Sequence, residues 1–273
     1  MNIPAGNRQE NVERFTGFAA LYDQHRPEAP KAVLEILEGY LGRKPQLVMD
    51  IGCGTGLSTM IWTGHAERVI GVEPNDGMRE QAEAKLRSSG ADAITFVKGF
   101  SNRLDTADES VDLITCSQSF HWMEPISTLQ EVNRVLKPGG VFAAFDCDWP
   151  PVIGWQLEQE YMRLIAAGDE LLERLEAPDS GAVKRDKEKH LATLRESGVF
   201  RYTREIVFHH QEDCTTERFI GLALSQGGLQ TVLKLQPEAL APAIEAFRIR
   251  VEKEFGEGSR TMRFGYRMRI GIK

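Results

Sequence analysis

Several features are scarce or absent in this chain of 273 residues. It has four cysteines, at positions 53, 116, 147 and 214, and no two of them form a Cys-x-x-Cys pair. This usage favours reduced, buried thiols in a cytoplasmic protein. No stretch approaches about 18 uninterrupted apolar residues, so we expect no membrane span. The N-terminal residues lack the apolar core of a signal peptide, which argues against secretion.

A basic tract is also missing. The formal net charge is −7, which gives no support to a broad contact with a phosphate backbone. We see no internal repeat and no low-complexity segment. The content of 41% hydrophobic and 27% charged residues is ordinary for a globular protein. The length allows one large α/β domain or two small ones.

A glycine-rich turn follows the first apolar run. Residues 47–51 are apolar apart from Asp50, and they lead into Gly52, Gly54 and Gly56. This order is typical of a buried strand, a tight turn and a helix start, where doubly wound sheets bind nucleotide-like ligands. Leu57 stands where a dinucleotide fingerprint has its last glycine, so the motif disfavours a nicotinamide cofactor.

Strand-like and helix-like segments alternate in the first half. This alternation predicts βαβ units and a parallel sheet. A Lys-Pro-Gly-Gly sequence at 137–140 is expected to end the last helix before the next strand. The predicted strands cover residues 47–51, 68–73, 93–97, 111–116 and 140–146, and the predicted helices cover 56–64, 76–88 and 126–136.

The organisation changes after Trp149. Helices are predicted over residues 155–175, 182–197, 215–235 and 237–255, a polar connection over 177–181, and strands over 199–210 and 261–272. The last strand alternates, with one apolar face and one basic face. We expect the basic face to be solvated; the alternative is a receptor for an anionic substrate. The apolar face holds Met262, Phe264, Tyr266, Met268, Ile270 and Ile272, and the basic face holds Arg263, Arg267, Arg269 and Lys273.

The turn at 50–56 resembles motif I of the class I S-adenosylmethionine (SAM)-dependent methyltransferases. Residues 18–27 resemble the Tyr-x-x-x-Arg-Pro segment of the methyltransferase type 11 group, and residues 131–140 resemble its junction between fourth helix and fifth strand. The Phe-His-Trp sequence at 120–122 looks like that of trans-aconitate methyltransferase-like enzymes. The resemblance implies an α/β fold with a doubly wound, mostly parallel seven-stranded sheet, Rossmann-like, and helical cap insertions.

The resemblance also implies one methyltransferase domain over residues 1–273. Residues 1–30 would form an N-terminal lid, 31–150 the SAM-binding core, and 151–273 the cap helices with the last two strands. The insertions at 152–198 and 211–258 would pack over the carboxyl ends of the strands. They would then cover the substrate pocket.

The cofactor prediction follows the groups that SAM presents. We expect the amides of the glycine turn and the following helix start to approach its carboxylate. Asp50 is placed to accept a hydrogen bond from its amino group, and Glu73, nineteen residues after Gly54, to accept both ribose hydroxyls. The predicted cofactor-binding residues are Asp50, Gly52, Cys53, Gly54, Gly56, Glu73, Pro74, Met78, Phe100, Ser101 and Gln118.

The adenine end depends on residues 97–102, which resemble the family's Gly-x-Ala-Glu segment. Ser101 and Asn102 stand at its last two positions, so the usual acid is missing. Phe100 is the candidate to stack on the base, and Ser101 the candidate to offer its amide. A plain surface turn is the alternative.

The loop after the fourth strand resembles the family's motif IV, with Gln118 beside the cofactor. Phe120, His121 and Trp122 are expected to line the meeting point of methyl donor and acceptor. His121 is the candidate general base, or else a histidine that shapes the loop.

The N-terminal segment supplies the candidate lid. Tyr22 and Arg26 are its predicted substrate or lid residues, and the alternative is that residues 18–27 form an amphipathic helix that covers the sheet.

No metal is expected. His209 and His210, with Glu212 and Asp213, are of metal-ligating types, but neighbours on a strand point to opposite faces. The predicted function is an enzyme, a SAM-dependent methyltransferase that acts on an O, N or C atom of a small molecule, with a carboxylic acid as candidate acceptor and S-adenosylhomocysteine as product. The alternatives are a non-catalytic SAM-binding protein, an RNA methyltransferase and a nicotinamide-dependent oxidoreductase. The oligomeric state is left open.

Overall fold

The computed structural model describes residues 3–175 and 183–273, and it contains one seven-stranded sheet. The strand order is β3-β2-β1-β4-β5-β7-β6. Strands β1 to β5 run parallel to one another. Strand β7 is antiparallel to both of its neighbours, β5 and β6. The predicted fold class is therefore confirmed. The strands are β1 (Leu47–Ile51), β2 (Arg68–Val72), β3 (Ile94–Val97), β4 (Val111–Ser117), β5 (Leu136–Cys147), β6 (Tyr202–Cys214) and β7 (Arg260–Ile272).

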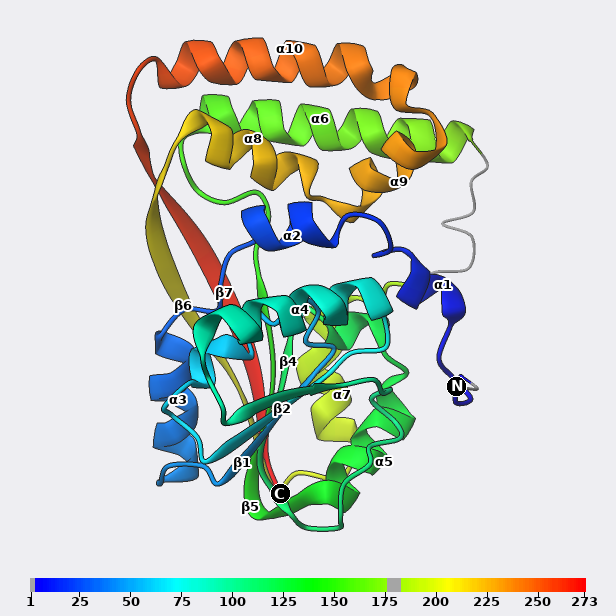
Figure 1. Cartoon of the computed structure of the whole chain (residues 1–273), viewed down its shortest axis with the longest axis vertical. Helices are drawn as coiled ribbons and strands as arrows, with labels where there is room; N and C mark the ends of the chain where they lie inside the picture. The colour runs from blue at the N-terminus through cyan, green and yellow to red at the C-terminus, as the bar shows by residue number, and fades with distance from the viewer. Residues whose placement is uncertain (1–2, 176–182) are drawn as a thin grey trace.

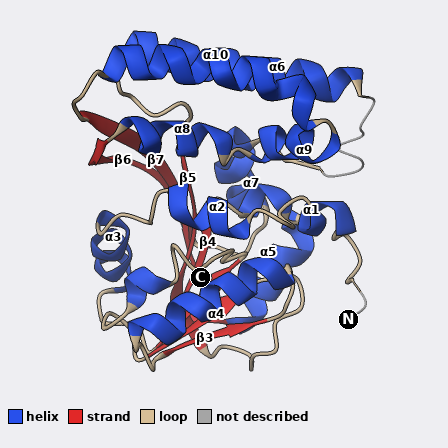
Figure 2. Ribbon diagram, turned by 45° about the horizontal axis from the view of Figure 1, so that its top comes forward, coloured by secondary structure: helices blue, strands red, loops and turns tan. Residues whose placement is uncertain are grey.

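Helices cover both faces of the sheet and its carboxyl-terminal edge. In Figures 1 and 2, α6, α8, α9 and α10 form a layer beyond this edge, and α1 and α2 lie between that layer and the sheet. The described helices are α1 (Gln9–Glu13), α2 (Ala19–His25), α3 (Ala32–Leu41), α4 (Asp76–Ser89), α5 (Pro125–Val135), α6 (Trp155–Arg174), α7 (His190–Glu196), α8 (Thr216–Leu224), α9 (Gly227–Leu235) and α10 (Pro237–Phe255), with 3-10 turns η1 (Met60–Trp62), η2 (Phe120–Trp122) and η3 (Lys187–Lys189).

The sheet core explains why the central strands read as apolar runs. Every residue of β1 is buried, because packed side chains cover both faces of the sheet. Val33 and Leu37 of α3 belong to the apolar cluster on one face, and Leu129 and Val132 of α5 belong to the cluster on the other. None of the helices in the described ranges combines the length and apolarity that a bilayer crossing requires.

Two predictions in the first half were wrong. The expected helix over 56–64 is only the short turn η1, because the hydroxyls of Ser58 and Thr59 donate to Asp50 and fold the chain back on the strand end. Strand β5 begins at Leu136 instead of residue 140, since Leu136 pairs with Val111. The pairing register shifts between this pair and the next, which accommodates the proline and glycines of 137–140.

The second half also differs from the prediction. The helix expected over 182–197 begins only at residue 187, and its main part, α7, packs against β6 and β7 instead of joining the cap. The helix expected over 215–235 is broken at Ser225 and Gln226 into α8 and α9. Strand β6 extends from 202 to 214 instead of 199 to 210. The predicted polar connection, residues 177–181, lies outside the described residues.

The alternation of the last strand is confirmed on its apolar face, whose six side chains are all buried. The basic face is not uniformly solvated. Arg269 is only 1% exposed, because its Nε lies 2.8 Å from Glu205 and its Nη1 lies 3.7 Å from Asp146. A charged residue can be buried in this way when it is paired.

Candidate cofactor and acceptor site

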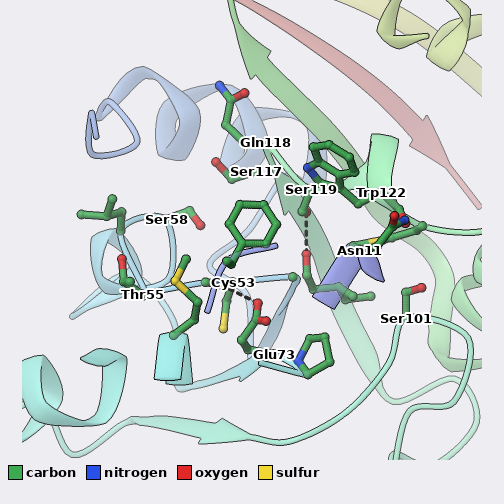
Figure 3. Close-up of a pocket in the computed structure, with 18 of the residues that line it drawn as sticks. Asn11, Cys53, Thr55, Ser58, Glu73, Ser101, Ser117, Gln118, Ser119 and Trp122 are labelled. Atoms are coloured by element: carbon green, nitrogen blue, oxygen red, sulfur yellow. Dashed lines mark hydrogen bonds between the residues drawn. The ribbon is translucent and has the colours of Figure 1, made fainter. Parts of the chain in front are cut away.

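A cavity opens at the carboxyl ends of β1, β2, β4 and β5, beneath α1 and α2. It holds about 1150 Å³ of empty space, including the solvent at its mouth. Figure 3 shows Glu73 across the cavity from Ser117 and Gln118. The predicted residues that line it are Tyr22, Arg26, Gly52, Cys53, Gly54, Glu73, Pro74, Met78, Phe100, Ser101, Gln118 and Trp122, whereas Asp50, Gly56, Phe120 and His121 do not.

The glycine turn forms one wall. Gly52 and Gly54 have φ of +68° and +56°, and a Cβ on Gly52 would lie 2.6 Å from that of Ser119. The amides of Gly52 and Cys53 both donate to the Val72 carbonyl, and that of Gly54 donates to Glu73. These amides are thus engaged within the protein, and no α-helix follows the turn. The helix start predicted beside the carboxylate is therefore wrong, and the approach of other amides of the turn to a carboxylate stays a prediction.

Asp50 supports the turn instead of facing the cavity. It is fully buried, and its carboxylate accepts hydrogen bonds from the hydroxyls of Ser58, Thr59 and Thr115, each at 2.7 Å. Burial raises the pKa of this carboxyl, and the three hydroxyls oppose the rise. A direct contact of Asp50 with an amino group of the ligand has no support, because these hydroxyls surround the carboxylate; a contact through water, the other form of the prediction, stays untested.

Glu73 stands at the end of β2, beside the turn. One carboxylate oxygen accepts from the Gly54 amide at 2.9 Å, and the other accepts from the Asn75 amide at 2.8 Å. The residue is 7% exposed, and burial raises its pKa to about 7. Each oxygen keeps a second lone pair, so Glu73 can accept two further hydroxyl groups at the cavity wall.

A buried hydroxyl in the same wall points to a ligand. The Oγ1 atom of Thr55 is buried, lines the cavity, and has no hydrogen-bond partner among the described residues. Such atoms are rare in folded proteins and call for an explanation. Sequence reasoning passed over Thr55 because it is one of the variable positions between the glycines. Together with Glu73, this hydroxyl gives the wall two polar groups with unused hydrogen-bonding capacity.

Phe100 and Ser101 also line the cavity that Glu73 and Thr55 line. Phe100 is 8% exposed and lines the cavity with Met78, so an apolar surface is present for a base. The Ser101 hydroxyl is already paired with that of Thr128 at 2.7 Å. Asn102 bonds to Asn7 of the N-terminal segment. The segment is thus more than a plain surface turn.

The opposite end of the cavity carries an uncompensated positive charge. The guanidinium of Arg26 lies 5.2 Å from the ring centroid of Tyr22 and 4.8 Å from that of Trp149. Its Nη2 atom donates to the Ser225 carbonyl and to Gln226. Within residues 3–175 and 183–273, Arg26 has no carboxylate partner in a salt bridge, and its buried Nε has no acceptor. An anionic group of a ligand would neutralise the guanidinium charge and accept a hydrogen bond from its Nε.

Several residues that line the cavity carry no recognisable signal in the sequence. Trp149, Cys147 and Tyr266 line the end that holds Arg26, but they come from the end of β5 and from the apolar face of β7. The Trp-Pro-Pro sequence at 149–151 indicates a change of organisation in this region but no ligand contact. All four cysteines are buried free thiols, as expected.

The N-terminal segment closes the cavity. Asn7, Asn11 and Phe15 line it, and none of them was predicted. The side chain of Asn11 donates to the Trp122 carbonyl at 2.7 Å and accepts from the Val183 amide at 2.8 Å. Asn75, which caps α4, donates to the Val12 carbonyl. This segment is therefore fastened to both ends of the site.

Phe120 and His121 lie behind the wall that Trp122 forms. Phe120 is 2% exposed and packs edge-on against Phe142. His121 is 4% exposed, and its Nδ1 lies 3.4 Å from Asp146. Burial lowers the pKa of His121 to about 4. The structure does not bring this ring to the cavity, so a direct catalytic contact has no support here.

Gln118 connects the cavity to the buried polar groups behind it. Its backbone φ is +53°, unusual for a residue other than glycine. Its side-chain nitrogen donates to the Cys147 sulfur at 2.9 Å, and its oxygen accepts from Lys187 at 3.1 Å. Lys187 Nζ also lies 2.9 Å from Asp146. Lys187 was not predicted, because nothing in a charged helix-like stretch distinguishes it.

Comparison with known proteins identifies the central segment. Residues 49–144 match the family model described as a methyltransferase domain. This segment is a methyltransferase domain of the type 11 group. A probable SAM-dependent methyltransferase of Saccharomyces cerevisiae is 32% identical over 128 residues, which are 46% of this chain and 44% of the yeast protein. The matches to the first curated relatives thus span only about half the length of those proteins.

Solved structures extend the likeness to nearly the whole chain. One from Anaeromyxobacter dehalogenans, which carries a type II methyltransferase designation, has a TM-score of 0.63 at 21% identity and covers 90% of this chain and 97% of its own. A phosphoethanolamine N-methyltransferase of Haemonchus contortus, in complex with S-adenosylhomocysteine, has a TM-score of 0.57 at 12% identity and covers 96% and 59%. At these identities the likeness shows that the methyltransferase domain and its surroundings share this fold.

Proposed function

We propose that this protein is a cytoplasmic, SAM-dependent methyltransferase that acts on an O, N or C atom of a small molecule. One observation carries the proposal. A single cavity joins a wall with a glycine turn, the Glu73 carboxylate and an unpartnered hydroxyl to a second wall of aromatic rings and an uncompensated arginine. The first wall suits SAM and the second suits an anionic acceptor.

Residues of the first wall would hold the cofactor. Glu73 has two lone pairs for a ribose diol, and Thr55 has a hydroxyl to donate or accept. Met78 and Phe100 give an apolar surface for adenine. When bound, SAM supplies an electrophilic methyl group. The protein's task is then to orient the acceptor and to exclude water.

Arg26 favours a carboxylic acid among the small acceptors. Guanidinium binds carboxylates in a planar, two-point arrangement, and here it is held between two aromatic rings with an unpartnered Nε. A carboxylate acceptor is ionised at neutral pH, so it needs no base at the cavity wall. SAM also carries a carboxylate that Arg26 could bind. An experiment must therefore show whether Arg26 binds the carboxylate of the acceptor or that of SAM.

The N-terminal segment and the cap would keep water out during transfer. Asn11 fastens this segment to the Trp122 loop, and Arg26 fastens it to the start of α9 at Gln226. The enclosed cavity and the negative net charge favour a small acceptor over RNA.

Calorimetric titration tests the proposal first. The protein is titrated with SAM and S-adenosylhomocysteine, with NAD and NADH as controls, and the series is repeated on Glu73→Ala. We expect binding of the adenosyl pair alone, weakened about 100-fold in the variant because two charge-assisted hydrogen bonds are lost. Binding of neither adenosyl compound, or of NAD instead, would overturn the proposal.

Turnover is tested next by measuring S-adenosylhomocysteine formation with a panel of small carboxylic acids and the matching neutral amides. We expect product with acids only. Tight SAM binding without turnover on any acid, amide or amine would favour a non-catalytic SAM-binding protein.

A further inference from the structure

A second cluster of polar groups lies behind the cavity, outside the proposed cofactor and acceptor walls. His121 of η2, Asp146 of β5 and His190, the first residue of α7, converge although 69 positions separate the first from the last. One nitrogen of each imidazole and one oxygen of the carboxylate lie within 4.8 Å of one another. The shortest separations are 3.4 Å from His121 Nδ1 and 3.9 Å from His190 Nε2 to Asp146.

All three side chains are buried, and each imidazole has a nitrogen without a hydrogen-bond partner. The residues are 3% to 4% exposed. Within the described residues, His121 Nδ1 and His190 Nε2 form no hydrogen bond, whereas Asp146 Oδ1 has the Lys187 ammonium at 2.9 Å. Two unpartnered nitrogens that face one carboxylate are what a ligand-binding site presents, since buried polar atoms otherwise find partners.

The donor set fits a transition metal. Two imidazoles and one carboxylate are ligands that Zn²⁺ takes, in sites that leave a further position for water. The two rings are nearly parallel, with centroids 6.4 Å apart, and the carboxylate lies within 4 Å of both.

One amino group competes for the same place. The Lys187 ammonium lies 2.9 Å from Asp146, on the short turn η3, and its side chain is 22% exposed. It can therefore swing toward solvent. Arg269 lies farther away, at 3.7 Å, and Glu205 holds it at 2.8 Å.

The local charge allows the exchange. Asp146 faces two cations, the ammonium of Lys187 at 2.9 Å and the guanidinium of Arg269 at 3.7 Å. Replacing the ammonium by a divalent ion keeps a cation beside this carboxylate.

We propose that His121, Asp146 and His190 form a binding site for one Zn²⁺ ion, which displaces the ammonium of Lys187. The ion would join the loop after β4 to β5 and α7, and so would fix the loop that carries Trp122 at the cavity. Metal binding is measured directly and without SAM, so its failure can be told apart from failure of the proposed function.

Metal titration of the full chain tests this. Chelator-treated protein is titrated with Co²⁺, followed by its visible absorption, and Zn²⁺ is then added in competition. We expect one equivalent of Co²⁺ per chain and its displacement by Zn²⁺. His190→Gln should weaken binding at least tenfold, and Lys187→Met should strengthen it at least threefold because the competing ammonium is gone.

The matched control is His209→Gln with His210→Gln, since these adjacent histidines on β6 are the other pair that could attract Co²⁺. Binding should be unchanged in this variant. Circular dichroism and SAM titration of each variant establish that it is folded. A wild-type chain that binds Co²⁺ no better than His190→Gln, or binding lost in the β6 variant instead, would overturn the proposal and leave a buried water as the occupant of the cluster.

Discussion

The two ends of the cavity are built in different ways. The cofactor end comes from the glycine turn between β1 and η1 and from the adjoining end of β2, and neighbouring residues along the chain bond to one another there. The proposed acceptor end comes from α2, from the loop after β5 and from β7, and Arg26, Trp149 and Tyr266 meet only in three dimensions. Bonds at the proposed cofactor end span 2 to 19 positions, so a short motif marks that end, whereas the proposed acceptor end has no comparable signature.

The difference extends to how polar groups are satisfied. At the cofactor end, Asp50 and Glu73 each accept several hydrogen bonds from the protein itself. At the proposed acceptor end, the partners of Arg26 among the described residues are carbonyl, amide and aromatic groups. The first end is preorganised for one ligand, and the second carries a charge that a ligand must complete.

The largest effect should come from removing the support beneath the cofactor end. Asp50→Ala leaves three buried hydroxyls without their acceptor, so we expect the free energy of unfolding to fall by about 3 kcal/mol. Urea unfolding measures it. The exposed Asp92→Ala serves as control and should change stability by less than about 0.5 kcal/mol. A loss for Asp50→Ala as small as the control's would show that the turn does not depend on this carboxylate.

Arg26 tests the acceptor end. Arg26→Met should raise the KM for a carboxylic acid acceptor about 20-fold, with a smaller change in kcat, because a charge-assisted contact is lost. Arg26→Lys should recover part of the loss. If the SAM affinity falls instead and the acceptor KM does not, Arg26 binds the cofactor carboxylate and the two ends share this residue.

The pH dependence of SAM binding sharpens the comparison, because only the cofactor end holds a group that titrates near neutrality. Burial raises the pKa of Glu73 from 4.5 to about 7. The ionised form accepts two hydroxyl hydrogen bonds and the protonated form does not, so SAM affinity should fall by up to about tenfold per unit as the pH drops below 7. Glu73→Gln should give a flat profile.

The raised pKa of Glu73 affects the stability of the ligand-free protein in the opposite direction: stability falls as the pH rises. Because the folded-state pKa lies above the unfolded value, the contribution of Glu73 to stability is fully present below about pH 4.5 and is lost as the pH rises through 7. Thermal unfolding of the wild type and of Glu73→Gln between pH 5 and 8 checks this difference. Parallel profiles for the two proteins would contradict the pKa assignment.

The smallest effect is expected at the fastening of the N-terminal segment. Asn11→Ala removes three hydrogen bonds to the loops of Trp122 and Val183 but no contact within the sheet. We expect SAM to dissociate about threefold faster, with little change in stability. Stopped-flow measurement of ligand release tests it, with the exposed Gln9→Ala as control. An unchanged release rate would show that the hydrogen bonds of Asn11 do not limit the opening of the cavity.

Much of the fold followed from local patterns. The runs at 47–51, 68–73 and 111–116 are apolar because their strands are covered on both faces, and each was placed within one or two residues. The six apolar side chains of β7 alternate because its two faces differ. The segment at 56–64 could not be predicted as a turn, because the bonds of Ser58 and Thr59 to Asp50 outweigh the helical character of its sequence.

The candidate site divides along the same line. The sequence by itself determined the glycine turn, Glu73 and the class of cofactor, because residues that are close in sequence at a strand end must also be close in space. Only the tertiary structure decided that Asp50 faces inward, that Arg26 has no acidic partner, and that His121, Asp146 and His190 meet. Some of these relations join segments more than 100 residues apart. Packing between elements brings these segments together, and no local pattern encodes that packing.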